Sequence, residues 1–370
     1  SKDLPGGTWE SRDTVAKGRV QILPAGPGHL SQAASVMAEY KRLSSLAGNW
    51  DWSKAAVVAR EWRYLEPVRA YCELYGIPVQ MADDDPPNFW RLRETQVLVE
   101  LVRSKKLLSG AQLREWVTGQ TRNDWVELLG EAIEEYESLV GGAEMPREHF
   151  LEWLAEWGRE IRRKQTGLLL LTAHRAKGLE FDHVTVLDGG WEQLSPGEDP
   201  DASRRLLYVA MTRARHTLTL ARFDRGNGMI SELLDSKAVL NRAKQEQHST
   251  AMLQRRYERL GLTDVDLGLA GRFEANMPIH RAISALKPDS PLELRFERDK
   301  WVLADSSGIT VGRLSATYKP PQGMVCTSAQ VSAIVVWSRS DSKSEYQGLC
   351  KCEKWEVVIP KLVFEPQRVQ

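Results

Sequence analysis

The feature that most constrains this chain is the stretch from Leu168 to Gly190, which reads LLLLTAHRAKGLEFDHVTVLDGG. An apolar strand leads into a polar turn, and a second apolar strand leaves it. In open α/β sheets, ligands bind beyond the carboxyl ends of such strands. Thr172, His174 and Lys177, with the permissive backbone of Gly178, are suited to holding a phosphate or a sugar. The stretch therefore predicts a sheet with a ligand-binding turn, although a Lys-Gly pair alone is common in turns without ligands.

Earlier residues supply further strands of the same sheet. Short apolar runs alternate with helical patterns, and strand, helix and strand in succession are typical of a parallel sheet. The strand patterns are Arg19–Leu23, Ala55–Ala59 and Val79–Met81, and the helical patterns are His29–Leu46 and Leu65–Tyr75. Three helical stretches between Ser109 and Lys164 interrupt the strands, so we expect them to be an insertion within one α/β domain.

The chain is thus predicted to hold several folded parts. Residues 1–108 and 165–235 form the α/β domain, and residues 109–164 form its short helical insertion. Residues 236–284 are charged and are predicted to be a helical connector. Short β runs separated by Gly, Pro and Ser indicate a small β-barrel-like domain at 285–370.

Composition limits the kinds of partner. Fifty basic and fifty acidic residues give a net charge of zero, so any contact with nucleic acid must be local. The longest apolar run is too short to cross a membrane, and we expect no membrane partner. Four cysteines are few and unevenly placed for disulfides or zinc, so no metal site is predicted and a reducing cytoplasm is the expected location. Cys350 and Cys352 are the weak alternative for a metal.

A second motif lies at Asp201–Ala221, DASRRLLYVAMTRARHTLTLA. Its first part predicts a helix with an apolar side, capped by Asp201 or Ser203 and ending in Arg213 and Arg215. An arginine that a rigid helix directs into a nucleotide site can stabilise the charge that develops in phosphoryl transfer. Taken alone, an arginine in the last turn more often complements the helix dipole.

Together the two stretches resemble motifs V and VI of the UvrD, Rep and PcrA helicases of superfamily 1. The family pattern Thr-x-His-x-x-Lys-Gly-Leu-Glu is present from Thr172 to Glu180, and Arg-Arg-Leu-x-Tyr-Val-Ala-x-Thr-Arg-Ala is present from Arg204 to Ala214. A weaker match, around Arg60, is similar to the family's Ala-Val-Leu-x-Arg segment. The resemblance covers about residues 15–235, and the insertion is much shorter than the 2B domain that the family carries there.

The resemblance implies a RecA-like second motor domain and a role for each matched residue. Arg213 is expected to reach the γ-phosphate of ATP. Glu180 is expected to contact the ribose, with Lys177 and Gly178 also on the nucleotide. Thr172 and His174 are expected to contact single-stranded DNA and couple it to ATP. Arg60 is expected to bind DNA as well.

The residues contain neither a GxxxxGK[ST] loop nor an apolar strand ending in Asp-Glu. ATP and Mg²⁺ are therefore expected to be bound mainly by a first motor domain, in the same protein or in a partner chain, and this chain alone should be inactive. The alternative is a non-catalytic module, derived from a helicase, that binds DNA or protein.

The downstream residues raise two further possibilities. Asp264–Gly271 and Val311–Leu314 resemble the tail of bacterial fusion helicases in which RecQ-type sequence precedes a UvrD-like end.

The terminal β domain could also bind single-stranded DNA, although core tryptophans and solvated charges are the commoner explanation for such residues. The residues in question are Trp301, Lys319, Trp337, Arg339 and Trp355.

Overall fold

In the computed structural model the chain divides into two compact units. Unit 1 contains residues 1–83 and 165–257, and unit 2 contains residues 84–164 and 258–370. The structure describes residues 18–47, 49–82, 87–161, 165–193, 199, 201–244 and 251–367. Within these residues, no helix is both long and apolar enough to span a membrane.

Unit 1 is built on a seven-stranded sheet in which every pairing is parallel. The strand order is β3-β6-β2-β7-β8-β1-β9. The strands are β1 (Arg19–Pro24), β2 (Ala55–Ala59), β3 (Val79–Met81), β6 (Leu168–Thr172), β7 (Phe181–Leu187), β8 (Ala214–Arg222) and β9 (Val239–Asn241). The predicted α/β class with a parallel sheet is therefore confirmed.

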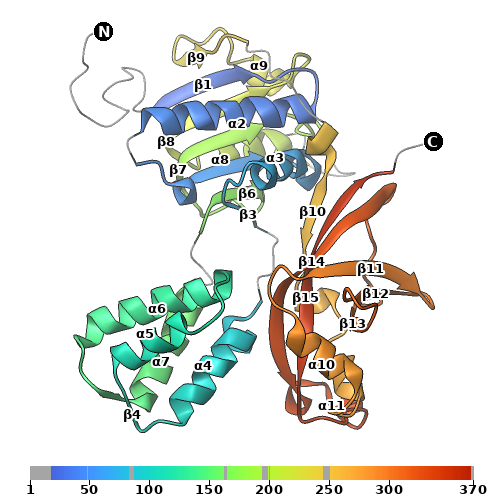
Figure 1. Ribbon diagram of the computed structural model, residues 1–370. Coiled ribbons are helices and arrows are strands. Elements are labelled where there is room, and N and C mark those ends of the chain that lie inside the picture. The colour runs from blue at the N-terminus through green and yellow to red at the C-terminus, as the bar shows by residue number, and fades with distance from the viewer. Residues whose placement is uncertain are drawn as a thin grey trace. The chain divides into compact units, whose positions relative to one another are not determined.

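Helices cover both faces of this sheet, which explains why the central strands are apolar throughout rather than alternating. The helices α2 (His29–Leu46) and α3 (Trp62–Leu74) lie on one face, where they pack on alternate side chains such as Val57 and Leu170 (Figure 1). The other alternate side chains, such as Val58 and Leu171, pack under α8 (Ala202–Met211) and α9 (Gly228–Ser231).

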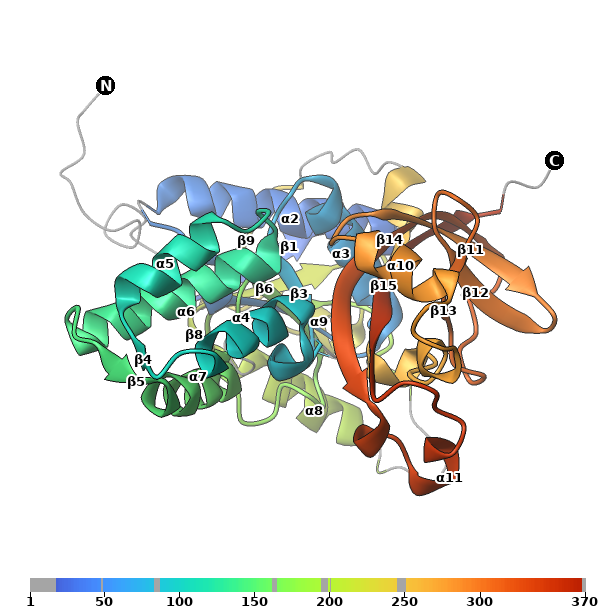
Figure 2. The ribbon, with the colours of Figure 1, turned by 60° about the horizontal axis from the view of Figure 1, so that its bottom comes forward.

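Unit 2 joins the inserted helices to the terminal strands. The helices α4 (Arg93–Arg103), α5 (Gly110–Thr118), α6 (Asp124–Val140) and α7 (Arg147–Ile161) form one bundle (Figure 2). Asn123 caps α6 by accepting from the backbone N–H groups of Trp125 and Val126, and Gly141 ends it in the left-handed conformation (φ 61°). The two short strands β4 (Leu107–Leu108) and β5 (Met145–Pro146) pair beside the helices.

The terminal part of unit 2 is a six-stranded sheet with the order β10-β15-β14-β11-β12-β13. The strands are β10 (Arg256–Arg259), β11 (Pro291–Glu297), β12 (Lys300–Ala304), β13 (Thr310–Arg313), β14 (Met324–Ser338) and β15 (Lys354–Pro366). The helices α10 (Pro278–Ala285) and α11 (Ser344–Gln347) accompany it. Its β structure agrees with the prediction, and a closed barrel stays a prediction.

The bundle and the terminal sheet share one hydrophobic core. Leu92, just before α4, bridges Val335 of β14, and Trp125 Nε1 donates to Ser332 O at 2.9 Å. Arg93 holds the carboxylate of Glu356 and also donates to two backbone carbonyls near the end of α10. The inserted helices therefore pack on the terminal sheet.

The helical connector predicted at 236–284 is wrong. Its described residues contain β9 and β10 together with short helices of which α10 is the longest. Val239 and Leu240 add a strand to the edge of the unit 1 sheet, and β10 adds one to the unit 2 sheet. The side chains of β9 and β10 are exposed or half-buried, so neither strand shows the continuous apolar side of a helix.

Candidate functional site

The turn after β6 links two opposite edges of the unit 1 sheet. Thr172 is level with Ala59 of β2, and His183 is level with Ala55. Both β6 and β7 run parallel to β2, so residues 173–180 carry the chain from the carboxyl edge back to the amino edge. At about 3.3 Å per residue, the two ends of this turn lie roughly 20 Å apart along the strands.

The carboxyl edge brings together the residues predicted to bind DNA. Arg60 directly follows β2, and His174 lies in the turn after β6. Arg60 Nη1 lies 3.4 Å from His174 Nδ1 and 3.5 Å from its Nε2, so the guanidinium contacts the imidazole ring. Thr172 is buried at the end of β6, where its carbonyl accepts from the backbone N–H groups of Arg175 and Ala176.

A Gly-Gly turn after β7 allows the start of α3 to pack closely beside this edge. A side chain on Gly189 would meet the Tyr64 ring, and one on Gly190 would meet the Glu61 carboxylate, each at 2.5 Å. Both glycines also have positive φ, of 111° and 74°. The preceding Asp188 is buried and accepts three backbone N–H groups, which holds the turn in place.

The amino edge holds the arginine predicted to reach the γ-phosphate. α8 ends at Met211, so Arg213 follows the helix instead of ending it, and Arg215 lies in β8. Arg213 Nε donates to Val209 O at 2.9 Å, and its Nη1 donates to Leu179 O at 3.1 Å. With the bond from Nη2 to the neighbouring hydroxyl, three of the five guanidinium N–H groups are used within the described chain. The other two remain for a ligand.

Glu180 lies next to Arg213, because the N–H of Phe181 donates to Arg213 O at 2.9 Å. The Glu180 carboxylate accepts from Arg215 Nε at 3.0 Å, and both side chains are more than half exposed. A carboxylate that an arginine already orients can still accept a hydroxyl, since it offers several lone pairs.

Lys177 and Gly178 lie in the turn between the two edges. Lys177 is exposed, and Gly178 has φ 84°, a conformation that favours glycine. The predicted site residues thus fall into two groups on one sheet. Arg60, Thr172 and His174 lie at the carboxyl ends of the strands, whereas Glu180 and Arg213 lie at the other edge because the turn crosses β2. Ligand binding by either group stays a prediction.

Sequence reasoning missed two residues at the carboxyl edge. The guanidinium of Arg175 lies over the Trp62 ring at 5.8 Å from its centroid, and Arg175 Nη1 donates to Ala82 O at 2.9 Å. Their positions offered a signal, since Trp62 follows Arg60 by two residues and Arg175 follows His174 directly.

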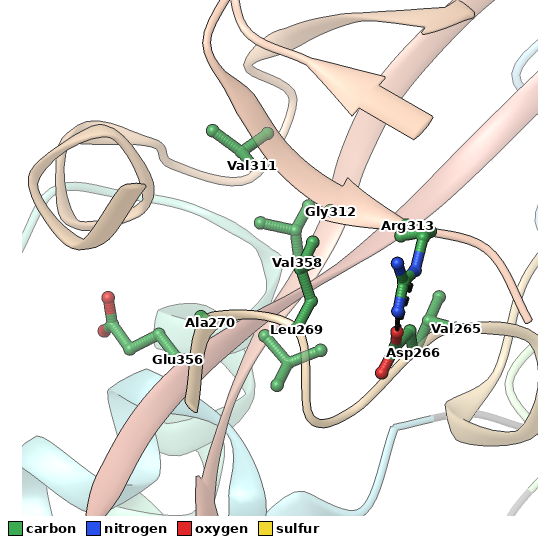
Figure 3. Close-up of a pocket in the computed structure, with 10 residues that line it drawn as sticks. Val265, Asp266, Leu269, Ala270, Val311, Gly312, Arg313, Glu356 and Val358 are labelled. Carbon is green, nitrogen blue, oxygen red and sulfur yellow. Dashed lines mark hydrogen bonds and ion pairs between the residues drawn. The ribbon is translucent and has the colours of Figure 1, made fainter. Parts of the chain in front are cut away.

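Unit 2 has a pocket of its own beside β13 and β15 (Figure 3). Two carboxylates lie in its mostly apolar wall. Asp266 is bound by Arg272 and Arg313, and Glu356 is bound by Arg93. Arginines thus pair with both carboxylates of the pocket.

Two tryptophans of the terminal domain are covered by other side chains. Trp355 is 3% exposed and its Nε1 donates to Leu267 O at 2.7 Å. The Trp337 ring has the guanidinium of Arg91 over it, at 4.1 Å from the centroid. Trp355 is therefore a core residue, whereas Trp337 is paired with an arginine as Trp62 is in unit 1.

The other three residues considered for DNA binding by this domain make unrelated contacts. Trp301 packs against Phe296 across the β11–β12 hairpin, with ring centroids 5.0 Å apart. Arg339 donates to Cys350 O at 2.8 Å, and Lys319 is exposed. Binding of single-stranded DNA by this domain stays a prediction.

The fold and these two edges define unit 1 as a parallel α/β domain in which one turn spans the sheet from its carboxyl edge to its amino edge. Comparison with known proteins identifies its central stretch. A family model described as the UvrD-like helicase C-terminal domain matches residues 167–221. Both motifs lie inside that range, so the resemblance to UvrD-like helicases is confirmed there.

Two known proteins extend the comparison. The chain is 42% identical over 71 residues to "Putative ATP-dependent DNA helicase YjcD" of Bacillus subtilis (strain 168), a match that covers 16% of this chain and 9% of that protein. The crystal structure of the C-terminal domain of a possible DNA helicase from Lactobacillus plantarum WCFS1 aligns with 60% of this chain and 83% of its own, at 13% identity and a TM-score of 0.30. The chain thus matches under a tenth of the curated relative.

Proposed function

We propose that this chain is the C-terminal part of an ATP-dependent DNA helicase or translocase. It supplies an arginine finger, Arg213, and a turn that couples single-stranded DNA to an ATP site completed by a first motor domain. ATP and Mg²⁺ are bound mainly by that other domain, in the same protein or in a partner chain. The cytoplasm is the location that this function predicts.

The observation that carries the proposal is the division of the motif residues between two edges of one sheet. Arg60, Thr172 and His174 lie at the carboxyl edge, and Glu180 and Arg213 lie at the amino edge. One turn, residues 173–180, connects them. A shift of this turn on DNA binding would move the backbone that holds Arg213, because Leu179 O accepts from its guanidinium.

Exposed apolar side chains beside Arg213 support a docking surface for the first motor domain. Leu179 is 42% exposed and Tyr208 is 66% exposed, although both belong to a folded α/β domain. Large apolar side chains next to an oriented arginine fit an interface that closes over a nucleotide. Lys177 and Gly178 are the further residues assigned to the nucleotide.

The proposal is tested by Arg213→Ala in an assembly that contains the first motor domain. DNA-stimulated ATP hydrolysis is expected to fall by about 10³-fold, because the charge developing in phosphoryl transfer loses its stabilising guanidinium. Binding of single-stranded DNA should be kept. The matched control is Lys237→Ala, which removes an exposed cation ahead of β9. Normal hydrolysis by Arg213→Ala would contradict the arginine-finger role.

The second candidate is a non-catalytic module that only binds DNA or protein. It is favoured by the lack of a phosphate loop in this sequence and by the short insertion. An intact first motor domain that hydrolyses ATP only together with this chain would exclude it. An assembly that binds DNA but never hydrolyses ATP would favour it.

A further inference from the structure

Trp62 and Arg175 form a pair at the carboxyl edge of the unit 1 sheet that the motif residues do not include. Trp62 is the first residue of α3, and Arg175 lies in the turn after β6. They come close because Ala59 of β2 is level with Thr172 of β6. The guanidinium then lies 5.8 Å from the centroid of the Trp62 ring.

The surrounding contacts hold both side chains of the pair. Trp62 is partly buried against the core under α2 and α3, so its ring is fixed on one side. Arg175 Nη1 donates to Ala82 O at 2.9 Å, and the backbone N–H of Arg175 donates to Thr172 O at 2.9 Å. A fixed aromatic ring with a fixed cation beside it loses little conformational entropy on binding.

The charges around the pair suit a polyanion. Arg60 lies between β2 and α3, Arg63 lies in α3, and Arg175 and Lys177 lie in the turn after β6. The acidic neighbour in this segment is Glu61, whose carboxylate pairs with Arg63 at 3.1 Å. Arg60 Nε is also buried without a hydrogen-bond partner. A buried donor without an acceptor is costly, and a shift of the guanidinium that brings this donor to a phosphate oxygen would relieve that cost.

We propose that Trp62 and Arg175 are a base-stacking platform, so that the carboxyl edge holds single-stranded nucleic acid by a base as well as by its phosphates. The proposal rests on the DNA-binding function assigned above to Arg60 and His174. An indole ring stacks on an unpaired base, and an arginine can add a cation–π contact or hold the adjoining phosphate. In a duplex, neighbouring base pairs already cover both faces of the base, so the platform favours single strands.

The test compares binding of the full chain to an oligo-dT strand and to the same strand with abasic sites in its centre. For the unaltered chain, removal of the bases should weaken binding roughly 5- to 100-fold, the range expected for stacking on one aromatic side chain. Trp62→Leu should lose the same factor on oligo-dT and should no longer distinguish the two strands. Trp62→Phe should restore the difference, and circular dichroism checks that each variant is folded.

The salt dependence of DNA affinity distinguishes the contribution of Arg175 from that of Trp62. Arg175→Gln should lower the slope of log affinity against log salt by about one, whereas Trp62→Leu should leave the slope unchanged. Lys237→Ala is the charge control. If Trp62→Leu still distinguishes the two strands as the unaltered chain does, the platform is disproved while DNA binding stands. If the unaltered chain shows no salt-sensitive binding, the DNA-binding function fails first and the platform fails with it.

Discussion

At the scale of single residues, one buried and one half-buried carboxylate hold loops in place, one in each unit. Asp188 in unit 1 is 1% exposed and accepts the backbone N–H groups of Gly189, Phe223 and Asn227. Asp266 in unit 2 is held by two arginines. Removing one partner from such a group leaves the others unsatisfied, which costs more than the bond itself contributes.

Asp266→Asn is expected to lower the free energy of unfolding of unit 2 by about 2 kcal/mol at pH 7. Burial by itself raises the pKa of Asp266, but the hydrogen bonds and charges of Arg313 and Arg272 outweigh it and hold the pKa below its ordinary value. Because the pKa of Asp266 is lower in the folded state than in the unfolded state, ionisation of this carboxyl stabilises unit 2. The contribution is complete at pH values above the unfolded-state pKa, near 4, and is lost as the pH falls through the folded-state pKa.

The measurement is urea denaturation of both proteins at several pH values. The difference in the free energy of unfolding should be constant above about pH 5 and should shrink below about pH 4. Trp355, whose Nε1 donates to Leu267 O, lies beside Asp266 and makes fluorescence a suitable signal. A difference that does not change with pH would show that the ion pairs do not stabilise unit 2.

The sequence predicted which site residues belong together better than it predicted where they lie. Thr172, His174 and Arg60 were expected at one place, and the structure brings Arg60 and His174 into contact. The position of Glu180 and Arg213 at the other edge depends on how the turn crosses β2, which spacing alone does not reveal. Trp62 was missed because its proposed role depends on its contact with Arg175, which is distant in sequence.

At the scale of elements, α4 is the link between the inserted helices and the terminal sheet. Arg93 in its first turn donates to Glu356 of β15 and to the carbonyls of Ile283 and Leu286. Arg91, just ahead of it, pairs with Asp341 in a bidentate contact. These bonds join residues that are 190 to 263 positions apart in the sequence, so they specify tertiary structure rather than local structure.

Arg93→Ala is expected to destabilise unit 2 by about 2–4 kcal/mol, because a partly buried carboxylate and two carbonyls lose their donor. Hydrogen exchange should become faster in both α4 and β15. The control is Arg159→Ala in α7, whose pair with Glu156 is 3.6 Å long and exposed, and this change should cost under about 0.5 kcal/mol. Equal effects of the two substitutions would argue against α4 as the link.

Elements with a clear apolar pattern were predictable from sequence. The pattern at His29–Leu46 matches α2 in full, and the run at Ala55–Ala59 matches β2. The segment at 236–284 was not predictable, because β9 and β10 are edge strands whose pairing partners lie far away in sequence. Short exposed strands have too few buried residues to show a period.

At the scale of the whole molecule, the chain passes from unit 1 to unit 2, returns to unit 1 and then enters unit 2 again. The inserted helices are therefore one half of a core whose other half is the terminal sheet. From the sequence, the insertion was expected to belong to the α/β domain, and the terminal strands were expected to form a domain of their own. Packing between segments that are distant in sequence joins the inserted helices to the terminal sheet. A periodic pattern of apolar residues within one segment does not show such packing.

Replacing residues 87–161 by a short Gly/Ser linker should leave unit 1 folded and damage the terminal sheet. Leu92, which bridges Val335 of β14, and Trp125, which donates to Ser332 O, would be lost with the helical part of the shared core. Hydrogen exchange should stay slow in β2 and β6 but become fast in β14, and the dye ANS should bind. Slow exchange in β14 after the replacement would show that the terminal sheet is stable without the helices.

This alternating order has a consequence during synthesis on the ribosome. The helices of residues 93–161 are made before roughly 200 further residues that include their packing partners β14 and β15. At about 5–20 residues per second, the apolar sides of these helices wait some 10 to 40 s for those strands. Nascent chains of this kind are substrates for chaperones that shield apolar helices, and their yield should depend on such chaperones more than that of a chain folding in sequence order.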